Sequence, residues 1–475
     1  MYLITVSGEI PLRTSRTRPK FYRVLLENIG DAVRRGGANV LENKIINAKI
    51  LIVTDKEALL NISRVFGVHR VARVIDYQFK DLRDLSMWIF ENTKDIVKDK
   101  KFAIRVKRSG VHSFRSVDVA REAGALLKPL SSGVDLDNPE IELEVEVHGD
   151  TAFLYKESLS GPGGLPLGVE GKALVLFSGG FDSPVAAWLM AKRGIQVDFL
   201  HYMMGSSQAS YYSFMVARKL AQEWLHGYGS KFIVVDFTNV IMEISKKVEW
   251  AYRQVILRAL MYIISFKLAN KMNYDGIVTG ESIGQASSQT LKNISSIEAA
   301  IKPSLPIFRP LISLDKEEII KVSRVLGLFD LSSKVTESCA IAPQRVVTST
   351  TPNEIVEQLS KIDHSVIESA ASSAKIFYVS KARPEDIILT NDIEIDFIPE
   401  DAIVIDARSR PEIGKLPANA IPISKVSPPE LPRDKIVIVV CETGSISYLL
   451  AKMFRENGVM AYSLKGGLRG YSLSR

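Results

Sequence analysis

The spacing of apolar residues in the first third of the chain predicts helices and strands in mixed order. Apolar positions three and four residues apart are typical of helices, whereas apolar residues that alternate with polar ones are typical of half-buried strands. The expected helices cover residues 19–34, 82–97 and 117–127, and the expected strands cover 3–6, a pair within 40–53, 71–75, 102–106 and 141–147. This mixture predicts two small α+β units, residues 1–70 and 71–165.

From residue 172 onward, short apolar strands alternate with helices. The expected strands cover residues 173–177, 196–202, 232–237 and 276–279, and the expected helices cover 184–193, 210–227 and 248–272. This rhythm is typical of a doubly wound parallel sheet and predicts an α/β unit over residues 172–375. A helical stretch over 353–377 is expected to end that unit.

The C-terminal residues 390–475 show the pattern of one more compact α/β unit. Its expected strands cover 402–406 and 435–440, and its expected helix covers 446–457. Residues 161–168, which precede the central unit, are rich in Gly and Pro. They suit either an interdomain linker or a turn-rich ligand loop. The predicted fold class is therefore a multidomain α/β protein.

Length and composition limit the kind of protein further. The chain has 475 residues, of which 46% are hydrophobic and 24% charged, and a globular chain of this length is too long for one domain. No apolar run reaches the roughly 18 residues of a transmembrane helix. The first residues lack the pattern of a secretory signal. We therefore expect a cytoplasmic protein without a membrane partner.

The charge of the chain is uneven. Residues 1–128 hold 25 Lys or Arg against 14 Asp or Glu, a net of +11, whereas the remainder holds 36 against 40, a net of −4. This asymmetry indicates that the first quarter of the chain offers a surface to a polyanion. The remainder has the charge balance of a conventional enzyme body.

A loop of small polar residues, Ser178-Gly-Gly-Phe-Asp-Ser183, lies between an expected strand and an expected helix. Glycines allow close approach of a ligand, and a helix N-terminus attracts anions, although a Gly-Gly pair alone also suits an ordinary turn. The whole string resembles the PP-loop of N-type ATP pyrophosphatases, which adenylate a substrate. The resemblance implies that ATP and Mg²⁺ bind here, with Asp182 near the metal or the reacting phosphate and no metal site built from protein alone. It implies phosphate contacts from Ser178, Gly179, Gly180 and Ser183, and contacts to the base or ribose from Leu176 and Phe177.

A second loop, residues 278–293, is rich in Gly, Ser and Gln and follows an expected strand. Open α/β sheets place ligands at such strand ends, and a solvated loop is the plainer alternative. The string closely resembles the second nucleotide-site loop of tRNA 4-thiouridine synthetases. This resemblance implies that Gly280 and Gln289 contact ATP. It also implies that Arg258 stands at the family's basic ATP-contacting position, where lysine is more common and the hydrogen-bond geometry differs.

Cations cluster on the expected strand 102–106 and in the loop after it. Clustered cations suit a structured RNA that is recognised by shape, although a solvated charged strand is the alternative. The combination resembles the core of a THUMP domain, and the unit before it resembles a ferredoxin-like domain of the same enzymes. These resemblances imply a tRNA partner. The implied tRNA contacts are Arg105, Lys107, Arg108, His112, Arg115, Arg13, Arg16, Arg18 and Lys20.

The chain has two cysteines, too few for a disulfide framework or a four-cysteine zinc site. Cys441 ends an expected strand and begins a loop before a helix, where backbone N–H groups favour a thiolate. A buried hydrophobic role is the commoner alternative. A tyrosine-phosphatase role is disfavoured because Ser447 stands where that chemistry needs arginine. The surrounding segments resemble a single rhodanese domain, which implies that Cys441 carries persulfide sulfur.

Cys339 considered alone is more often structural than catalytic. In 4-thiouridine synthetases with a rhodanese domain, a cysteine at this place pairs with the persulfide cysteine during turnover. All four units resemble such an enzyme in order. The resemblance implies that ATP adenylates O4 of the tRNA uridine at position 8 and that the Cys441 persulfide delivers sulfur. It further implies a cysteine desulfurase or other sulfur donor, and a reductant for the resulting disulfide.

Two other functions stay open. The chain could mainly carry sulfur for thiamine thiazole synthesis through its rhodanese-like unit, or it could be a non-catalytic RNA-binding scaffold. The intact PP-loop-like string argues against the scaffold. The oligomeric state, including a homodimer, stays open because no expected helix has a sustained heptad pattern.

Overall fold

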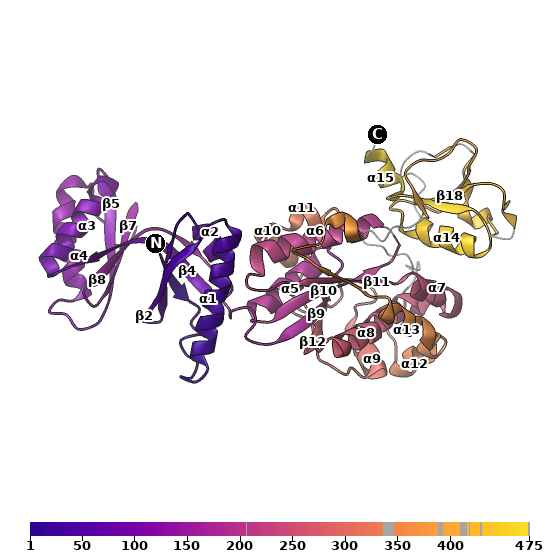
Figure 1. Cartoon of the computed structure of the whole chain (residues 1–475), viewed down its shortest axis with the longest axis horizontal. Helices are drawn as coiled ribbons and strands as arrows, with labels where there is room; N and C mark the ends of the chain where they lie inside the picture. The colour runs from indigo at the N-terminus through magenta and orange to yellow at the C-terminus, as the bar shows by residue number, and fades with distance from the viewer. Residues whose placement is uncertain are drawn as a thin grey trace. The chain divides into compact units, whose positions relative to one another are not determined.

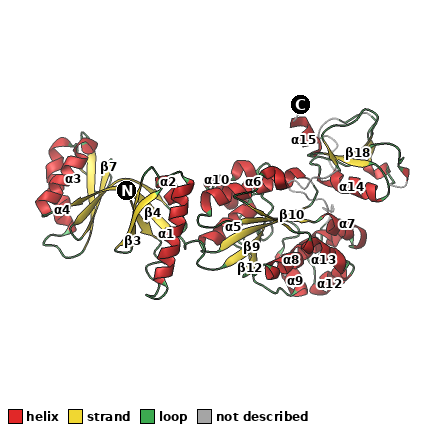
Figure 2. Ribbon diagram, viewed as in Figure 1, coloured by secondary structure: helices red, strands yellow, loops and turns green. Residues whose placement is uncertain are grey.

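The computed structural model describes residues 1–205, 207–335, 346–387, 393–408, 416–417, 419–427 and 430–473. The chain forms two compact units, one of residues 1–169 with 192–194 and one of residues 170–191 with 195–475. Figures 1 and 2 show the secondary structure of both. No helix of the described residues is both long and apolar enough to cross a membrane.

The N-terminal unit is built on one eight-stranded sheet in the order β2-β3-β1-β4-β8-β7-β5-β6. Its strands are β1 (Tyr2–Val6), β2 (Val40–Ile46), β3 (Lys49–Thr54), β4 (Val68–Gln78), β5 (Lys101–Ser109), β6 (Gly133–Val134), β7 (Ile141–His148) and β8 (Thr151–Ser160). Its helices are α1 (Arg18–Arg35), α2 (Leu59–Ser63), α3 (Leu82–Val97) and α4 (Ser116–Leu127). The expected elements are therefore present, but β6 and β8 were not predicted.

Strand β4 runs through the boundary expected at residue 70. It pairs antiparallel with β1 and with β8. Val68 and Val71 pack into the core around α1, whereas Ile75 and Tyr77 pack against the core around α3 and α4. The two small units are thus joined by one continuous strand, and their division at residue 70 stays a prediction.

Residues 161–168 lie against the N-terminal unit. Leu165 and Val169 pack into its core, and a side chain on Gly164 would meet the carbonyl oxygen of Lys192 at 2.1 Å. This close packing favours a structural connection over a ligand loop.

The central part of the second unit has a six-stranded sheet in the order β13-β12-β9-β10-β11-β14. Its strands are β9 (Lys172–Leu176), β10 (Gln196–Met203), β11 (Lys231–Asp236), β12 (Gly276–Val278), β13 (Ile307–Phe308) and β14 (Lys375–Tyr378). All pairs are parallel except β11 with β14. The predicted parallel sheet is confirmed, with one antiparallel edge strand.

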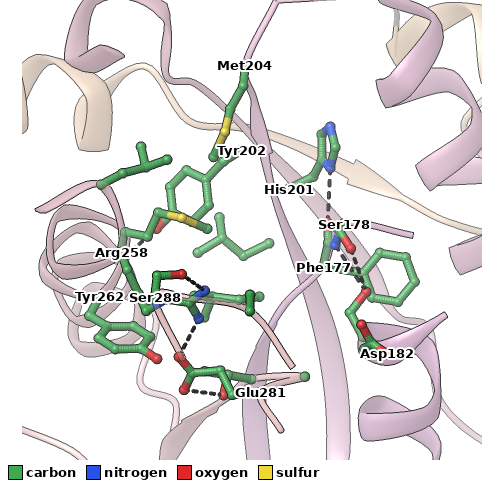
Figure 3. Close-up of a pocket in the computed structure, with 18 of the residues that line it drawn as sticks. Phe177, Ser178, Asp182, His201, Tyr202, Met204, Arg258, Tyr262, Glu281 and Ser288 are labelled. Atoms are coloured by element: carbon green, nitrogen blue, oxygen red, sulfur yellow. Dashed lines mark hydrogen bonds and ion pairs between the residues drawn. The ribbon is translucent and has the colours of Figure 1, made fainter. Parts of the chain in front are cut away.

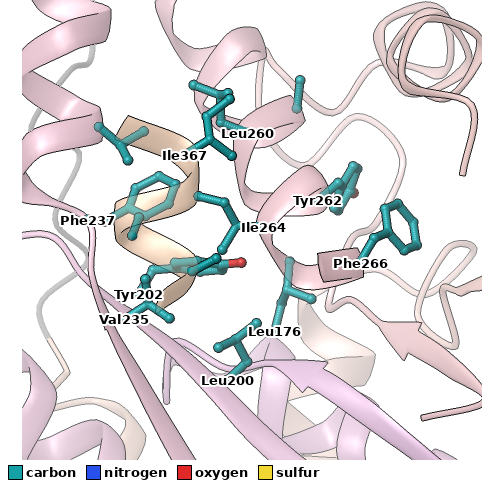
Figure 4. Packing of buried hydrophobic residues seen from close by; sticks show 14 of the residues in the cluster. Leu176, Leu200, Tyr202, Val235, Phe237, Leu260, Tyr262, Ile264, Phe266 and Ile367 are labelled. Carbon is teal, nitrogen blue, oxygen red and sulfur yellow. The ribbon is translucent and has the colours of Figure 1, made fainter. Parts of the chain in front are cut away.

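Helices cover both faces of this sheet, as Figure 2 shows. One face carries α5 (Asp182–Lys192), α6 (Ser207–Trp224), α10 (Lys316–Val325) and α11 (Phe329–Ser332). The other carries α7 (Thr238–Lys247), α8 (Arg253–Lys271), α9 (Leu291–Ile301), α12 (Pro352–Ser360) and α13 (His364–Ser372). In Figure 4, Leu176 and Leu200 from the strands lie opposite Leu260 and Ile264 of α8 and Ile367 of α13, all within one buried cluster.

The helix expected over residues 353–377 is wrong as a single element. The chain forms α12 and α13 instead, and then β14. Asp363 begins α13 because its carboxylate accepts a hydrogen bond from the backbone N–H of Ser365 at 2.8 Å. Ile376 and Phe377 extend along the sheet edge, paired with β11. Capping and edge pairing therefore override the helical pattern.

The C-terminal part of the second unit has a five-stranded parallel sheet in the order β15-β19-β18-β16-β17. Its strands are β15 (Glu394–Ile395), β16 (Ile403–Asp406), β17 (Ile421–Pro422), β18 (Val437–Val440) and β19 (Ala461–Leu464), and its helices are α14 (Ser445–Glu456) and α15 (Gly467–Leu473). The two predicted strands and the predicted helix are confirmed as elements. The rhodanese-like assignment stays a prediction.

Candidate active site

A cavity of about 360 Å³ lies at the carboxyl ends of β9, β10 and β12. The sheet order reverses here, because β10 pairs on one side of β9 and β12 pairs on the other. Such a switch point is where open α/β sheets bind ligands. In Figure 3, Ser178 and Asp182 lie on one wall, and Arg258 and Glu281 lie on the other.

Most of the residues predicted to contact nucleotide line this cavity. The lining includes Leu176, Phe177, Ser178, Asp182, Ser183, Arg258, Gly280 and Gln289. Gly179 and Gly180 belong to the same loop but do not line the cavity. Gly179 has a φ of +82°, and a Cβ there would lie 2.5 Å from the Cα of Ser213. Its role in the structure is therefore to let the loop pass α6 closely.

The buried hydroxyl of Ser183 organises the first loop. Its Oγ accepts hydrogen bonds from the backbone N–H groups of Ser178 at 3.1 Å and Gly179 at 3.2 Å. The second loop comes equally close, because a Cβ on Gly280 would lie 2.9 Å from the backbone nitrogen of Ser183. The two loops that the sequence identified separately thus meet at the first turn of α5.

Asp182 is held by two side chains that the sequence analysis missed. Lys316 Nζ lies 2.7 Å and 3.0 Å from its two carboxylate oxygens, and Gln285 Nε2 donates to Oδ2 at 2.8 Å. Lys316 begins α10, where the helix dipole disfavours a cation. That unfavourable position is the sequence signal that could have identified Lys316.

The opposite wall holds a buried cluster of charges around Glu281. Its carboxylate bonds with Arg258 Nη1, with Arg309 Nε at 2.7 Å and with Thr279 Oγ1 at 3.1 Å. Burial alone would raise the pKa of Glu281, but the two guanidinium groups outweigh it and hold the pKa below its ordinary value. Two guanidinium cations thus share one buried carboxylate. Arg309 was not predicted.

His201 lines the cavity and is fully buried. Its Nδ1 lies 3.0 Å from the carbonyl oxygen of Phe177, and its Nε2 lies 3.0 Å from Ser210 Oγ. Because a carbonyl only accepts, Nδ1 carries the proton of the neutral ring. Burial lowers the pKa of His201 to about 4. A histidine at the end of a buried strand was the available signal, and the sequence analysis missed it.

Cys441 lies in a separate loop, between β18 and α14, and is buried. Its Sγ accepts hydrogen bonds from the backbone N–H of Gly444 at 3.1 Å and of Ser447 at 3.4 Å, and Ser447 Oγ lies 3.3 Å away. Ser447 Oγ in turn bonds with Ser463 Oγ at 2.8 Å. Two amides and a hydroxyl thus converge on one sulfur. Cys339 lies outside the described residues.

Several cations predicted to contact tRNA have internal partners. Arg105 pairs with Glu142 at 3.1 Å. His112 accepts from Arg108 Nη1 at 2.6 Å, and its other ring nitrogen lies 2.6 Å from the carbonyl oxygen of Gly149. Arg115 pairs with Asp118, and Arg18 and Lys20 donate to backbone carbonyl oxygens. These three residues, with Lys107, Arg13 and Arg16, are exposed or half-buried in the same N-terminal unit. Their contact with tRNA stays a prediction.

Comparisons with known proteins identify the family of the chain. Residues 168–364 match the family model described as thiamine biosynthesis protein (ThiI), and residues 79–157 match the THUMP domain. A solved structure, described as a 4-thiouridine synthetase–RNA complex with bound ATP, is 27% identical with a TM-score of 0.68. The match covers 79% of this chain and 98% of that one.

Two curated relatives match over almost their whole length. A tRNA sulfurtransferase of Pyrobaculum aerophilum is 36% identical, over 96% of this chain and 95% of the relative. A tRNA sulfurtransferase of Desulfurococcus amylolyticus is 53% identical, over 99% of this chain and 98% of the relative. On this identity and coverage, the chain belongs to the tRNA sulfurtransferase family.

Proposed function

We propose that the protein is an ATP-dependent tRNA sulfurtransferase that forms 4-thiouridine at position 8 of tRNA. The observation that carries the proposal is the cavity in which the Ser178–Ser183 loop faces the Arg258–Glu281 wall. Its size suits a nucleotide, and the family relationship supplies the reaction. The neighbour with bound ATP supports ATP as the ligand, and the THUMP match supports tRNA as the partner.

The charges of the cavity suit a triphosphate. Arg258 lines the cavity and is paired with Glu281, and Lys316 is paired with Asp182 beside the Ser178–Ser183 loop. Arg309, behind the lining, is shared by Glu281 and Glu298. In a partly dry cavity a cation that faces the ligand attracts phosphate more strongly than it would in water. We assign the phosphates to the side of Ser178, Ser183 and Lys316.

A magnesium ion would be held mainly by the phosphates. Among the described residues, no group of three His, Cys, Asp or Glu side chains could hold a metal ion alone. Asp182 fits the part of a single carboxylate ligand, because Mg²⁺ commonly takes one or two carboxylates with the substrate phosphates. When bound, the ion would neutralise charge as pyrophosphate leaves. Lys316 would keep Asp182 oriented toward the cavity.

The adenylation step joins uridine O4 to the α-phosphorus of ATP, while the bond to the bridging oxygen of pyrophosphate breaks. O4 becomes part of AMP, which is a good leaving group. Lys316, on the side of the phosphates, stabilises the negative charge that builds on their oxygens, and Arg258 faces the ligand from the opposite wall. His201 is neutral at physiological pH and holds the carbonyl of Phe177, so that it shapes the cavity without adding charge.

Sulfur then comes from Cys441 as a persulfide, charged by a cysteine desulfurase or another sulfur donor. The terminal sulfur bonds to C4, and AMP leaves. Cys339 attacks Sγ of Cys441, which releases the thiolated tRNA and leaves a disulfide for an external reductant. The bonds from Gly444, Ser447 N–H and Ser447 Oγ stabilise negative charge on Cys441.

The direct test is incubation of the protein with unmodified tRNA, Mg-ATP and a sulfide source. We expect tRNA-dependent release of pyrophosphate and the near-ultraviolet absorbance of 4-thiouridine. Asp182→Ala should abolish both signals. Cys441→Ser should stop thiolation from a desulfurase donor but leave ATP binding intact. Absence of thiolation by the wild-type protein would refute the proposal.

A second function is supported by the family description, which names thiamine biosynthesis. Sulfur supply for a thiazole would need Cys441 but not adenylation of tRNA. We therefore expect Asp182→Ala to retain thiazole supply and Cys441→Ser to lose it. Equal loss in both variants would contradict a separate sulfur-carrier role.

A further inference from the structure

Trp250 presents an aromatic surface to solvent at the N-terminal end of α8. Its side chain is 56% exposed. It lies in a short 3₁₀ turn, Trp250–Tyr252, directly before the helix. Tryptophan is highly buried on average, and tryptophans that are exposed are enriched at binding surfaces.

The ring is held in place from one side. The guanidinium carbon of Arg253 lies 4.7 Å from the centroid of the Trp250 ring. Arg253 is itself fixed, because Nη2 donates to the carbonyl oxygen of Ser245 at 2.6 Å and Nε donates to that of Val248 at 3.2 Å. Trp250 is therefore a preformed platform, with one face on an anchored cation and its remaining surface open.

The platform adjoins the candidate ATP cavity. Gln254 and Leu257, from the same end of α8, line that cavity, and Arg258 and Met261 continue the lining along the helix. Gln254 follows Trp250 by four positions, which corresponds to about 6–8 Å along the axis. Trp250 does not itself line the cavity but lies about one helical turn before the residues of α8 that do.

The surroundings of Trp250 suit a nucleic acid. Lys246 and Lys247 lie in the last turn of α7, and their side chains are 60% and 46% exposed. Lys246 pairs with Glu456 at 3.9 Å and Lys247 with Glu243 at 2.6 Å, and such exposed ion pairs contribute only about 0–1 kcal/mol, so that a phosphate can replace the carboxylate. Ser245, which holds Arg253, directly precedes the two lysines. An aromatic face beside exposed cations is the combination that binds unstacked bases together with their phosphates.

The proposed reaction requires such a surface. Uridine O4 must reach ATP inside the cavity, and a base within a stacked helix cannot do so. Extrusion of the base costs the stacking it had in the RNA. An aromatic ring at the edge of the cavity replaces that stacking.

We propose that Trp250 is a substrate-binding residue on which the target uridine stacks after it leaves the RNA fold. The inference rests on the proposed function and adds to it the element that receives the base. Arg253 is a positioning residue, since it acts through the indole ring.

Steady-state thiolation tests this assignment. Trp250→Ala should lower kcat/KM for unmodified tRNA by roughly 5- to 150-fold, the range for loss of one aromatic–base stack. Trp250→Phe, which keeps a ring, should recover most of the activity, and ATP affinity should stay within twofold in both variants. Tyr378→Ala is the matched control, because Tyr378 is a comparably exposed aromatic residue, at 51%, on strand β14.

A photochemical measurement gives a readout besides activity. A tRNA transcript that carries 4-thiouridine at the target position is bound to the wild-type protein and irradiated in the near ultraviolet. We expect the cross-linked peptide to contain Trp250.

Either of two results would overturn the inference: a cross-link that maps away from Trp250, or a Trp250→Ala protein with the kcat/KM of the wild type. A failure of the proposed function can be distinguished from a failure of the stacking role, because the wild-type protein itself would then form no 4-thiouridine. If the wild type forms 4-thiouridine and the Trp250→Ala protein is equally active, the stacking role is refuted and the proposed function is kept.

Discussion

The charge cluster behind the candidate ATP cavity gives the sharpest prediction. Glu281→Gln removes the buried carboxylate that faces both Arg258 and Arg309, and only 3% of the Glu281 side chain is exposed. Removing one partner of a buried ion pair costs about 3–5 kcal/mol, because the other charge stays buried without compensation. Here two cations would lose the same partner.

The same substitution should weaken ATP binding. The carboxylate fixes the Arg258 guanidinium against the cavity, and a hydrogen bond to a charged group contributes about 1.5–3 kcal/mol. We expect ATP affinity to fall by roughly 10- to 150-fold. Isothermal titration with ATP measures this loss. The loss of about 3–5 kcal/mol of stability should also lower the melting temperature of the nucleotide-binding part, which is identified as the transition that ATP shifts upward. At about 2–4 °C per kcal/mol for a domain of this size, we expect a decrease of roughly 6–20 °C.

Glu298 offers a matched control. It also pairs with Arg309, but 37% of its side chain is exposed. Because exposed ion pairs contribute about 0–1 kcal/mol, Glu298→Gln should change the melting midpoint by a few degrees at most and leave ATP affinity unchanged. If Glu281→Gln and Glu298→Gln lose the same stability, the buried cluster does not have the energetic role described.

Three other substitutions test separate parts of the structure. Gly280→Ala puts a Cβ about 2.9 Å from the backbone of Ser183, so ATP affinity should fall at least tenfold in a titration while the other units keep their melting transitions. Burial lowers the pKa of His201 to about 4, whereas a histidine in the unfolded chain has a pKa of about 6.5. The unfolded chain therefore takes up the proton at a higher pH than the folded protein does. As the pH falls from about 6.5 to 4, the free energy of unfolding should decrease by up to about 3 kcal/mol. Urea titrations of His201→Gln should lack that part of the slope, and an unchanged slope would exclude His201 as its source. Ser447→Ala removes a hydroxyl beside Cys441 and should slow sulfur transfer roughly tenfold at unchanged ATP affinity, whereas wild-type rates would show that the backbone amides suffice.

Local chemistry made the loops of the active site predictable. The strings at residues 178–183 and 278–293 carry their own signals, because small residues, a carboxylate and amides must follow one another closely. The strands beside them are uniformly apolar, which reveals a parallel sheet. For these reasons the sequence located both loops at the cavity.

The residues that the sequence analysis missed come from distant elements. Lys316 pairs with Asp182 across 134 positions, and Arg309 joins Glu281 from the end of β13. The position of Lys316 at the start of a helix marks it as unusual, but nothing near Lys316 or Arg309 along the chain indicates which carboxylate it pairs with, since folding alone brings the partners together. The wrong helix over 353–377 has the same origin, because β14 forms only where β11 offers an edge.

Strand β4 has a consequence for how the RNA is selected. Its first half belongs to one hydrophobic core and its second half to another, and Lys49 of β3 is bonded to Glu146 of β7. A hinge between these two cores would have to break a β-ladder and expose apolar residues, so they turn as one piece. The cations on the two halves are therefore held at a fixed distance from one another. For the predicted tRNA contacts on both halves, we expect RNAs to be distinguished by the distance between their phosphates, and a variant with a longer β4 to change which RNAs bind although every predicted contact residue is kept.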